Sequence, residues 1–301
     1  MRGTDRFNGS GTLKVTWLAM RHVGRYSKRL GGWLAARLWF TPWRAKLSAN
    51  AQAREAGWLE GTRSLRIEVE GPELRGFIVG EGPTVLLVYG WGERASTMGA
   101  FIAPLTAAGY RVAAIDLPGH GETPSTDPNL YVIADALKRA ARELGDIDAV
   151  VAHSMGGLAT TVALADGLVA DKVVLLAPAI RLEHGLTKFN ALFDVPPRAA
   201  EGLRDHIDRR FGRDVWDHFA GDHLAAGITS PALIIHDEED PQVDFADGRT
   251  LAESWPSARF EATRGLGHVK IVRDDEIVTR VVDFLSGRDA RTEPLQAASV
   301  R

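Results

Sequence analysis

Two patterns of hydrophobic and polar positions alternate along most of the chain, from about residue 64 onward. Short, continuously apolar runs rich in β-branched residues predict strands, and they read LRIEVE, TVLLVYG, RVAAIDL, IDAVVAHS, KVVLLAPA, PALIIHD and ARFEATR. Between them, apolar residues recur every three or four positions, most clearly over 129–144 and 274–287, which predicts helices. Buried strands alternating with amphipathic helices predict an α/β fold, with a mostly parallel central sheet covered by helices on both faces.

Three segments fall outside this alternation. Residues 181–228 are rich in charge and hold no strand-like run, which predicts a small helical lid over the carboxyl edge of the sheet. Residues 287–301 have little periodicity, so we expect a loose C-terminal tail. Residues 1–62 precede the first predicted strand and should form a helical extension. The α/β domain itself should therefore span 63–286.

Charged residues are distributed unevenly along the chain. The formal net charge is −3, yet residues 1–50 contain ten Lys or Arg, a single Asp and four of the eight tryptophans. Tryptophan beside basic residues on an amphipathic helix is typical of an interfacial membrane anchor, here over residues 14–44. The alternative is a pair of short helices, interrupted at Gly31 and Gly32, whose basic face packs on the acidic remainder. That acidic remainder argues against a nucleic-acid partner.

Composition narrows the chemistry and the location further. The absence of cysteine excludes disulfides, thiolate catalysis and cysteine-based zinc sites. The nine histidines show no metal-ligand spacing, so we expect no metal. The chain contains no apolar window of about 18 residues, so no transmembrane helix is predicted. The run LGGWLAARLWF lacks the features of a secretory signal. We therefore expect a cytoplasmic protein, associated peripherally with membrane if residues 14–44 form an anchor.

The stretch VAHSMGGL, residues 151–158, places Ser154 where a predicted strand gives way to a helix of small residues. One interpretation is that the serine caps this helix. The other is a strained turn that presents the hydroxyl as a nucleophile, with room left by Ala152, Gly156 and Gly157. The N–H of Met155, at the start of the helix, would then point at a developing oxyanion.

A serine nucleophile needs a base and an acid that orients the base. His268 lies in RGLGHVKIV, after the last predicted strand, and Asp240 lies in the loop after the preceding strand. Along the chain these candidates follow one another as Ser154, Asp240 and His268. The neighbouring acids Asp237, Glu238 and Glu239 remain rivals of Asp240.

Together these motifs resemble α/β-hydrolases of the serine esterase and lipase type, over roughly residues 64–286. AHSMGG is similar to the family's nucleophile elbow, VYGWGE to its oxyanion loop, DLPGHG to the loop after the next strand, and HDEEDPQV and GLGHVKI to its acid and histidine loops. The resemblance implies the α/β-hydrolase fold, a Ser154–Asp240–His268 triad and no cofactor. It also implies that the backbone N–H of Trp91 is the second oxyanion donor, beside that of Met155.

Some residues depart from the family pattern or compete with it. Tyr89 stands where the family usually has histidine, which leaves the anchoring of the oxyanion loop open. The pattern favours Asp240 as the acid, with Asp237 bracing the turn. His120 and His153 do not fall at the base position, so we expect them to pack the loops.

The resemblance implies hydrolysis of carboxylic esters through an acyl-enzyme. Short-to-medium acyl esters or monoacyl lipids are the expected substrates, with Tyr89, Phe189 and Phe193 as candidate contacts. A C–C bond hydrolase or a cofactor-free perhydrolase could use the same triad. Branches with an aspartate nucleophile are disfavoured by Ser154 and by a lid without tyrosine. The fold also serves catalytically silent binding proteins, against which the intact triad argues.

Overall fold

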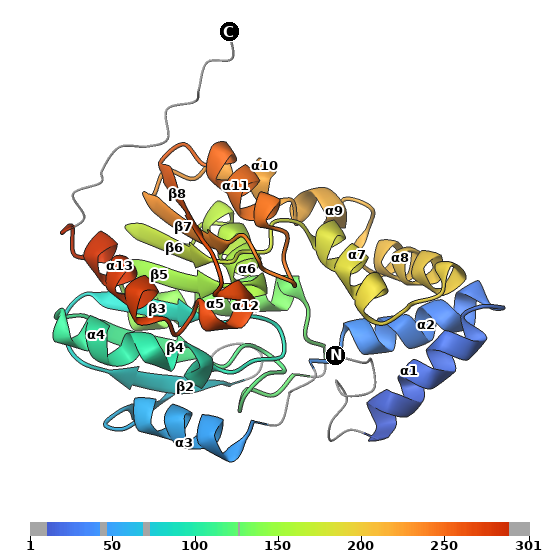
Figure 1. Cartoon of the computed structure of the whole chain (residues 1–301), viewed down its shortest axis with the longest axis horizontal. Coiled ribbons are helices and arrows are strands. Elements are labelled where there is room, and N and C mark those ends of the chain that lie inside the picture. The colour runs from blue at the N-terminus through green and yellow to red at the C-terminus, as the bar shows by residue number, and fades with distance from the viewer. Residues whose placement is uncertain (1–10, 43–46, 69–72, 126, 289–301) are drawn as a thin grey trace, which may run out of the picture.

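A single eight-stranded sheet forms the centre of the computed structural model, which describes residues 11–42, 47–68, 73–125 and 127–288 (Figure 1). The strand order is β1-β2-β4-β3-β5-β6-β7-β8. The pairs from β4 to β8 are parallel, whereas β1 and β2 join at one edge in antiparallel fashion. The strands are β1 (Arg63–Ile67), β2 (Leu74–Val79), β3 (Thr84–Val88), β4 (Arg111–Ile115), β5 (Ile147–His153), β6 (Lys172–Leu176), β7 (Ala232–Asp237) and β8 (Ala258–Thr263). The predicted mostly parallel sheet is confirmed.

The strand β2 was not predicted. Its sequence LRGFIV is broken in the middle by Gly76, which weakens the strand signal. The glycine is needed because a Cβ there would lie 1.9 Å from the carbonyl oxygen of Ala114 on β4. The close approach of β2 and β4 thus explains why position 76 is a glycine and why the sequence did not predict β2.

Helices cover both faces of the sheet. A 3-10 helix (Ala95–Phe101) leads into α4 (Ile102–Ala107), which packs with α13 (Asp275–Leu285) on one face, and α5 (Leu130–Leu144) packs with α6 (Met155–Ala165) on the other. Farther along, α11 (Phe245–Ser254) covers β7 and β8, α12 (Gly267–Lys270) is a single turn, and α3 (Ala49–Trp58) precedes the sheet. The helices expected at 129–144 and 274–287 are confirmed as α5 and α13, and the side chains of Asn129 and Asp274 cap them.

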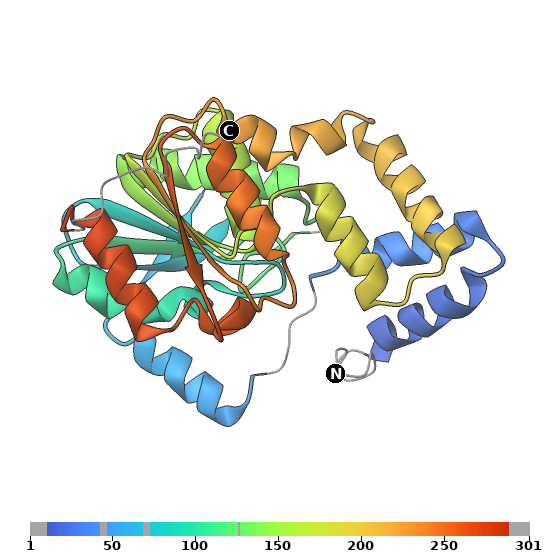
Figure 2. The same ribbon diagram turned by 45° about the horizontal axis from the view of Figure 1, so that its top comes forward.

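Most of the remaining helices form a lobe beside the sheet, which both views show (Figures 1 and 2). The exception is α10 (Gly221–Ala225), which packs against α6 and α11. The interval between β6 and β7 contains α7 (Leu182–Leu192), α8 (Pro197–Phe211), α9 (Val215–His218) and α10, as its composition predicted. The N-terminal helices α1 (Gly11–Val23) and α2 (Lys28–Trp39) pack together, and α2 lies along α8. None of the described helices combines the length and the apolarity needed to cross a bilayer.

Ion pairs and ring contacts hold the N-terminal helices to the inserted ones. Lys28 lies 2.8 Å from Asp205 and 3.7 Å from Glu201, both on α8, and Arg21 lies 3.8 Å from Asp194. These pairs bring part of the basic segment against acidic residues, as the packing alternative predicted. The partner surface is the inserted helices, however, rather than the body of the α/β domain.

Gly31 and Gly32 were expected to interrupt the N-terminal helix, and this expectation was wrong. The helix α2 runs through both glycines, and the break comes earlier, between Val23 and Lys28. A Cβ on Gly32 would lie 2.3 Å from the carbonyl carbon of Gly202 on α8, and one on Gly31 would lie 2.5 Å from the Cα of Gly24. The glycines therefore allow backbones to touch, and this contact compensates for their low helix propensity.

We expect Gly32→Ala to destabilise the protein by about 1–3 kcal/mol, since the added methyl group must push α2 and α8 apart. The matched control is Gly57→Ala on α3, where nothing lies within 4 Å of the added Cβ. That variant should gain about 0.5 kcal/mol from higher helix propensity. Urea unfolding of the two variants measures the difference, and equal effects of one sign would contradict the packing described here.

Candidate active site

Ser154 occupies the sharp turn between β5 and α6, in a backbone conformation that few non-glycine residues adopt. Its φ is 56° and its ψ is −127°, a strained geometry that costs about 1–3 kcal/mol and persists only where the surroundings enforce it. A Cβ on Gly156 would lie 2.3 Å from the carbonyl oxygen of Tyr89, and one on Gly90 would lie 2.9 Å from the Cβ of Ser154. Small residues therefore let the loop after β3 close on the turn.

The hydroxyl of Ser154 faces a histidine and does not cap the helix. Its Oγ lies 2.9 Å from Nε2 of His268, and no hydrogen bond from this side chain to the start of α6 is formed. On the other side of the ring, Nδ1 of His268 lies 2.6 Å from Oδ2 of Asp240. The structure thus brings together the three residues that the motifs selected, in the order serine, histidine, carboxylate.

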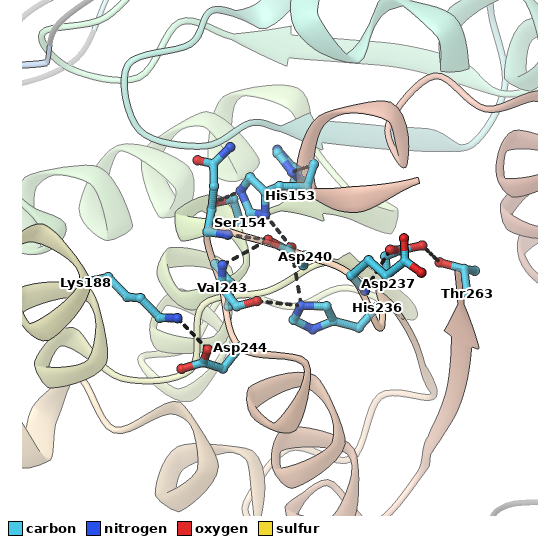
Figure 3. Close-up of polar contacts among 12 residues, drawn as sticks. His153, Ser154, Lys188, His236, Asp237, Asp240, Val243, Asp244 and Thr263 are labelled. Carbon is cyan, nitrogen blue, oxygen red and sulfur yellow. Dashed lines mark hydrogen bonds and ion pairs between the residues drawn. The ribbon is translucent and has the colours of Figure 1, made fainter. Parts of the chain in front are cut away.

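The carboxylate of Asp240 is completely buried and has a partner for each oxygen (Figure 3). Oδ1 accepts the N–H groups of Gln242 (2.7 Å) and Val243 (3.0 Å), while Oδ2 faces His268 and, at 3.4 Å, Nε2 of His236. Burial alone would raise the pKa of Asp240, but the two imidazoles and the Val243 N–H outweigh it and hold that pKa well below its usual range. Asp240 is therefore an anion that can orient a histidine and support its positive charge.

Sequence reasoning missed His236 as part of this site. The residue lies on the buried strand β7, and its Nε2 also faces the carbonyl oxygen of Val243 at 3.3 Å. A Cβ on Gly248 of α11 would lie 2.4 Å from Nδ1 of His236, so α11 presses directly on the ring. The only signal in the sequence was a histidine four residues before the acid. Spacing alone does not distinguish a histidine of the site from one that packs in the core.

Asp237 braces the turn, as predicted. Its buried carboxylate accepts the N–H of Glu239 (3.0 Å), the hydroxyl of Thr263 (2.9 Å) and the N–H of Leu266 (3.0 Å). Burial acts to raise the pKa of Asp237, but the backbone donors outweigh it and the pKa is lowered. These bonds tie the acid loop to the segment that leads to His268, so the rival carboxylate supports the site structurally.

We expect Asp237→Ala to destabilise the protein by about 3 kcal/mol, because it leaves three donors without their acceptor in a buried place. Glu238→Ala is the matched control, since the neighbouring carboxylate is exposed and pairs with the exposed Arg264. Denaturant unfolding should separate the two variants clearly. A loss of stability as small as that of the control would contradict the bracing role.

Tyr89 anchors the loop after β3, where the family resemblance left the anchoring open. The residue is 0% exposed, its hydroxyl accepts the N–H of Leu117 at 2.5 Å, and it faces Oδ1 of Asp116 at 3.4 Å. Asp116 also accepts the N–H groups of Ala95 and Glu122. The DLPGHG loop is thus fastened to the loop after β3. Tyr89 was expected to contact the substrate, but it is buried and instead holds these two loops together.

Of the two expected oxyanion donors, one follows Ser154 directly in the chain and the other lies in the loop after β3. Met155 is the first residue of α6, so the helix offers no acceptor for its N–H. Trp91 lies in the loop that Gly90 brings against Ser154, and its half-buried ring makes an edge-on contact with His120, with centroids 5.0 Å apart. His120 is fully buried, which agrees with its expected role in loop packing.

A second histidine–carboxylate contact links three loops of the site and was not predicted. Nε2 of His153 donates to the carbonyl oxygen of His268 at 2.9 Å, and its Nδ1 lies 3.4 Å from Oε2 of Glu93. The same Glu93 oxygen accepts the N–H of Gly90 at 3.1 Å. His153 was expected to pack loops, and it does so by joining the serine turn, the loop after β3 and the histidine loop.

These contacts also set the charge of the site. Burial raises the pKa of a carboxylate such as Glu93, but the neighbouring His153 and the Gly90 N–H outweigh it, so the pKa of Glu93 is lowered. Burial lowers the pKa of His268; the hydrogen bond and the charge of Asp240 oppose this shift without reversing it. His268 is therefore held ready in its neutral form, which can accept a proton.

Phe189 and Phe193 lie where the inserted helices meet the N-terminal ones. Their ring centroids are 4.7 Å apart, Phe189 also meets Trp39 edge-on at 5.1 Å, and the carbonyl oxygen of Phe193 accepts a 2.8 Å bond from Nε1 of Trp17. Both phenylalanines are buried. Both side chains thus pack between the two groups of helices, and their contact with a substrate stays a prediction.

Metal ligands are not gathered in the part of the chain that the structure describes. No group of three or more His, Asp or Glu side chains there is placed to hold a metal ion.

A mostly parallel eight-stranded sheet with Ser154, His268 and Asp240 on the loops at its carboxyl edge defines the class as the α/β-hydrolase fold. The model of the Alpha/beta hydrolase family matches residues 85–281, which is more than half of the chain. The chain therefore belongs to this family, as its motifs indicated.

Similarity to individual proteins is more limited. The pimeloyl-[acyl-carrier protein] methyl ester esterase of Methylococcus capsulatus is 35% identical over 139 residues, which cover 44% of this chain and 52% of that protein. The enzyme of the same name from Aromatoleum aromaticum is 41% identical over 76 residues, 25% of this chain and 29% of that protein. The chain thus matches about half or less of the length of these curated relatives.

Solved structures show the same fold at low identity. An esterase of Pyrococcus furiosus superposes with a TM-score of 0.64 at 19% identity, over 82% of this chain and 97% of that one. An esterase from Exiguobacterium antarcticum gives a TM-score of 0.59 at 16% identity, over 74% and 99% of the two chains. Likeness at this identity concerns the architecture alone.

Proposed function

We propose that the protein is a serine hydrolase that cleaves carboxylic esters through an acyl-enzyme. The observation that carries the proposal is the line of contacts from Ser154 through His268 to Asp240, with Ser154 held in a strained turn. Membership of the α/β-hydrolase family supports it. So do the relatives named as methyl ester esterases, which share segments of this chain.

The chemistry follows from the arrangement. Oγ of Ser154 forms a bond to the ester carbonyl carbon while its proton passes to Nε2 of His268. Collapse of the tetrahedral intermediate breaks the carbon–oxygen bond of the leaving alcohol, which takes that proton from His268. Water then adds to the acyl-enzyme with His268 again as base, and the acid leaves as Ser154 recovers its proton. The backbone N–H groups of Trp91 and Met155 stabilise the oxyanion in both steps.

We expect kcat/KM for an uncharged ester to fall as the pH drops through the pKa of His268, since only the neutral ring accepts the proton. Burial lowers that pKa, so the fall should come below the usual histidine value of about 6.5. A pH profile with a folding check at each acidic point measures this. A midpoint well above the usual value would contradict the buried, neutral base.

The proposed substrates are esters of short-to-medium acyl chains or monoacyl lipids. Hydrolysis of p-nitrophenyl esters over a series of acyl lengths tests both the reaction and the chain length. Turnover with a clear optimum supports the proposal and defines the acyl group. Folded protein that hydrolyses none of the series, yet is acylated by a serine-directed probe, would instead indicate C–C bond hydrolysis or perhydrolysis. Protein that reacts with neither would indicate a silent binding role.

A further inference from the structure

The exposed large hydrophobic side chains of the described residues concentrate on the two N-terminal helices and the turn that joins them. Five of the eight lie between residues 15 and 33, and they are 47–72% exposed: Val15, Leu18, Tyr26, Leu30 and Trp33. The others, Val169, Leu192 and Val269, lie in three separate parts of the chain. A cluster of this kind on an otherwise well-packed protein is typical of a binding surface.

Burial distinguishes an inward and an outward side on α1 and α2, and Tyr26 is exposed in the turn between them. On α1, Trp17 and Met20 point inward and are buried, whereas Leu18 is exposed. On α2, Leu34 and Leu38 are buried, while Leu30 and Trp33 are exposed, as are Arg29 and Arg37. Exposed apolar side chains and exposed basic side chains thus lie next to one another along this part of the chain.

Charge on these outward faces is entirely basic. Residues 11–42 contain no Asp or Glu. The cations Arg21 and Lys28 pair with carboxylates of the inserted segment, but Lys14, Arg25, Arg29 and Arg37 are exposed and lie beyond ion-pair distance of every described carboxylate. Part of the basic charge thus serves internal packing, and the rest is left facing outward among exposed aromatic and aliphatic side chains.

We propose that this basic apolar surface, formed by Val15, Leu18, Tyr26, Leu30 and Trp33 with Lys14, Arg25, Arg29 and Arg37, docks on an anionic phospholipid bilayer. Exposed Trp and Tyr favour the boundary between headgroups and acyl chains, and basic side chains are attracted to anionic lipid. The helices have 13 and 12 residues, about 20 Å each, against a hydrocarbon core of about 30 Å. They would therefore lie on the membrane rather than cross it.

The docking surface is attached to the inserted helices, and these reach the acid loop. Trp17 and Trp39 contact Phe193 and Phe189 at the end of α7. On the far side, α7 is joined to the segment after Asp240 by an ion pair of Lys188 with Asp244 (Figure 3) and by His184, whose Nδ1 lies 3.0 Å from Asp247. The docking surface is thus connected through α7 to the segment that follows Asp240.

Flotation of the full-length protein with vesicles tests the docking without measuring turnover, so it stands or falls separately from the proposed hydrolysis. The vesicles contain phosphatidylcholine alone, or phosphatidylcholine and phosphatidylglycerol in equal amounts. We expect binding to the anionic vesicles, weakened by added salt. Arg25→Glu with Arg29→Glu should weaken it at least about tenfold, as each basic side chain near an anionic surface is worth roughly fivefold. Leu18→Gln with Trp33→Gln should weaken it similarly.

The matched controls are Arg142→Glu and Val169→Gln, an exposed cation and an exposed valine elsewhere on the molecule, which should bind as wild type. Thermal melting confirms that each variant is folded, and single substitutions replace any double variant that is not. The proposal is overturned if wild type stays unbound, or if both double variants float as well as wild type. It is equally overturned if wild type does not float but self-associates through this surface, with the variants monomeric.

Discussion

Replacing Ser154 with alanine is expected to abolish ester hydrolysis while the protein stays folded. The change removes the proposed nucleophile, Oγ, which lies 2.9 Å from Nε2 of His268. Loss of a serine nucleophile from such a triad lowers kcat by about 10⁴- to 10⁶-fold, because the remaining groups can only bind and polarise the ester. Initial rates with the best p-nitrophenyl ester measure it.

Ser64→Ala serves as the control for this substitution, since Ser64 is exposed on the edge strand β1. It should leave kcat unchanged. Alanine at position 154 keeps a Cβ in the strained turn, so melting temperatures of the two variants should stay close to that of wild type. Residual activity in Ser154→Ala within tenfold of wild type would mean that another group carries the reaction.

Replacing Asp240 with asparagine should have the second largest effect, about 10⁴-fold in kcat. The asparagine keeps the shape and can still accept the N–H groups of Gln242 and Val243. Its amide nitrogen, however, would face Nδ1 of His268 and favour the tautomer that carries its proton on Nε2, which cannot take the serine proton. The charge that supports the imidazolium is lost as well.

The matched control for Asp240→Asn is Asp244→Asn in the same segment, where the carboxylate is 59% exposed and pairs with Lys188. That variant should retain most of the activity. Steady-state kinetics of the two variants therefore separates the charge at one position from any general effect on the loop. A rate for Asp240→Asn near that of its control would remove Asp240 from the proposed mechanism.

The strands that the sequence predicted well are those buried on both faces. TVLLV and ALIIHD are buried at every position, so their continuous apolar runs left little ambiguity. The strand β2 escaped because Gly76, required by the approach of Ala114, interrupts the run. The course of α2 was misjudged for a related reason: Gly32 lowers helix propensity, but it is tolerated because Gly202 lies against it. Both errors concern contacts between distant segments.

In the candidate site too, residues within local motifs could be predicted, whereas residues placed by contacts between distant segments could not. Ser154, Asp240 and His268 each lie in a loop motif with its own flanking strand, so they could be found one at a time. Glu93 could not, because its contact with His153 joins residues 60 positions apart and no local pattern records it. The burial of Tyr89 against Asp116 could not be predicted either, because it depends on how two neighbouring loops meet.

Reaction with a fluorophosphonate probe, followed by peptide mapping, tests the central claim most directly. The probe phosphonylates a serine only where a neighbouring base has made the hydroxyl nucleophilic and an oxyanion site receives the oxygen. We predict labelling of Ser154 in the native protein, none after unfolding and none in Ser154→Ala. Native, folded protein that stays unlabelled, or that carries the label on another serine, would contradict the account of Ser154 as the nucleophile.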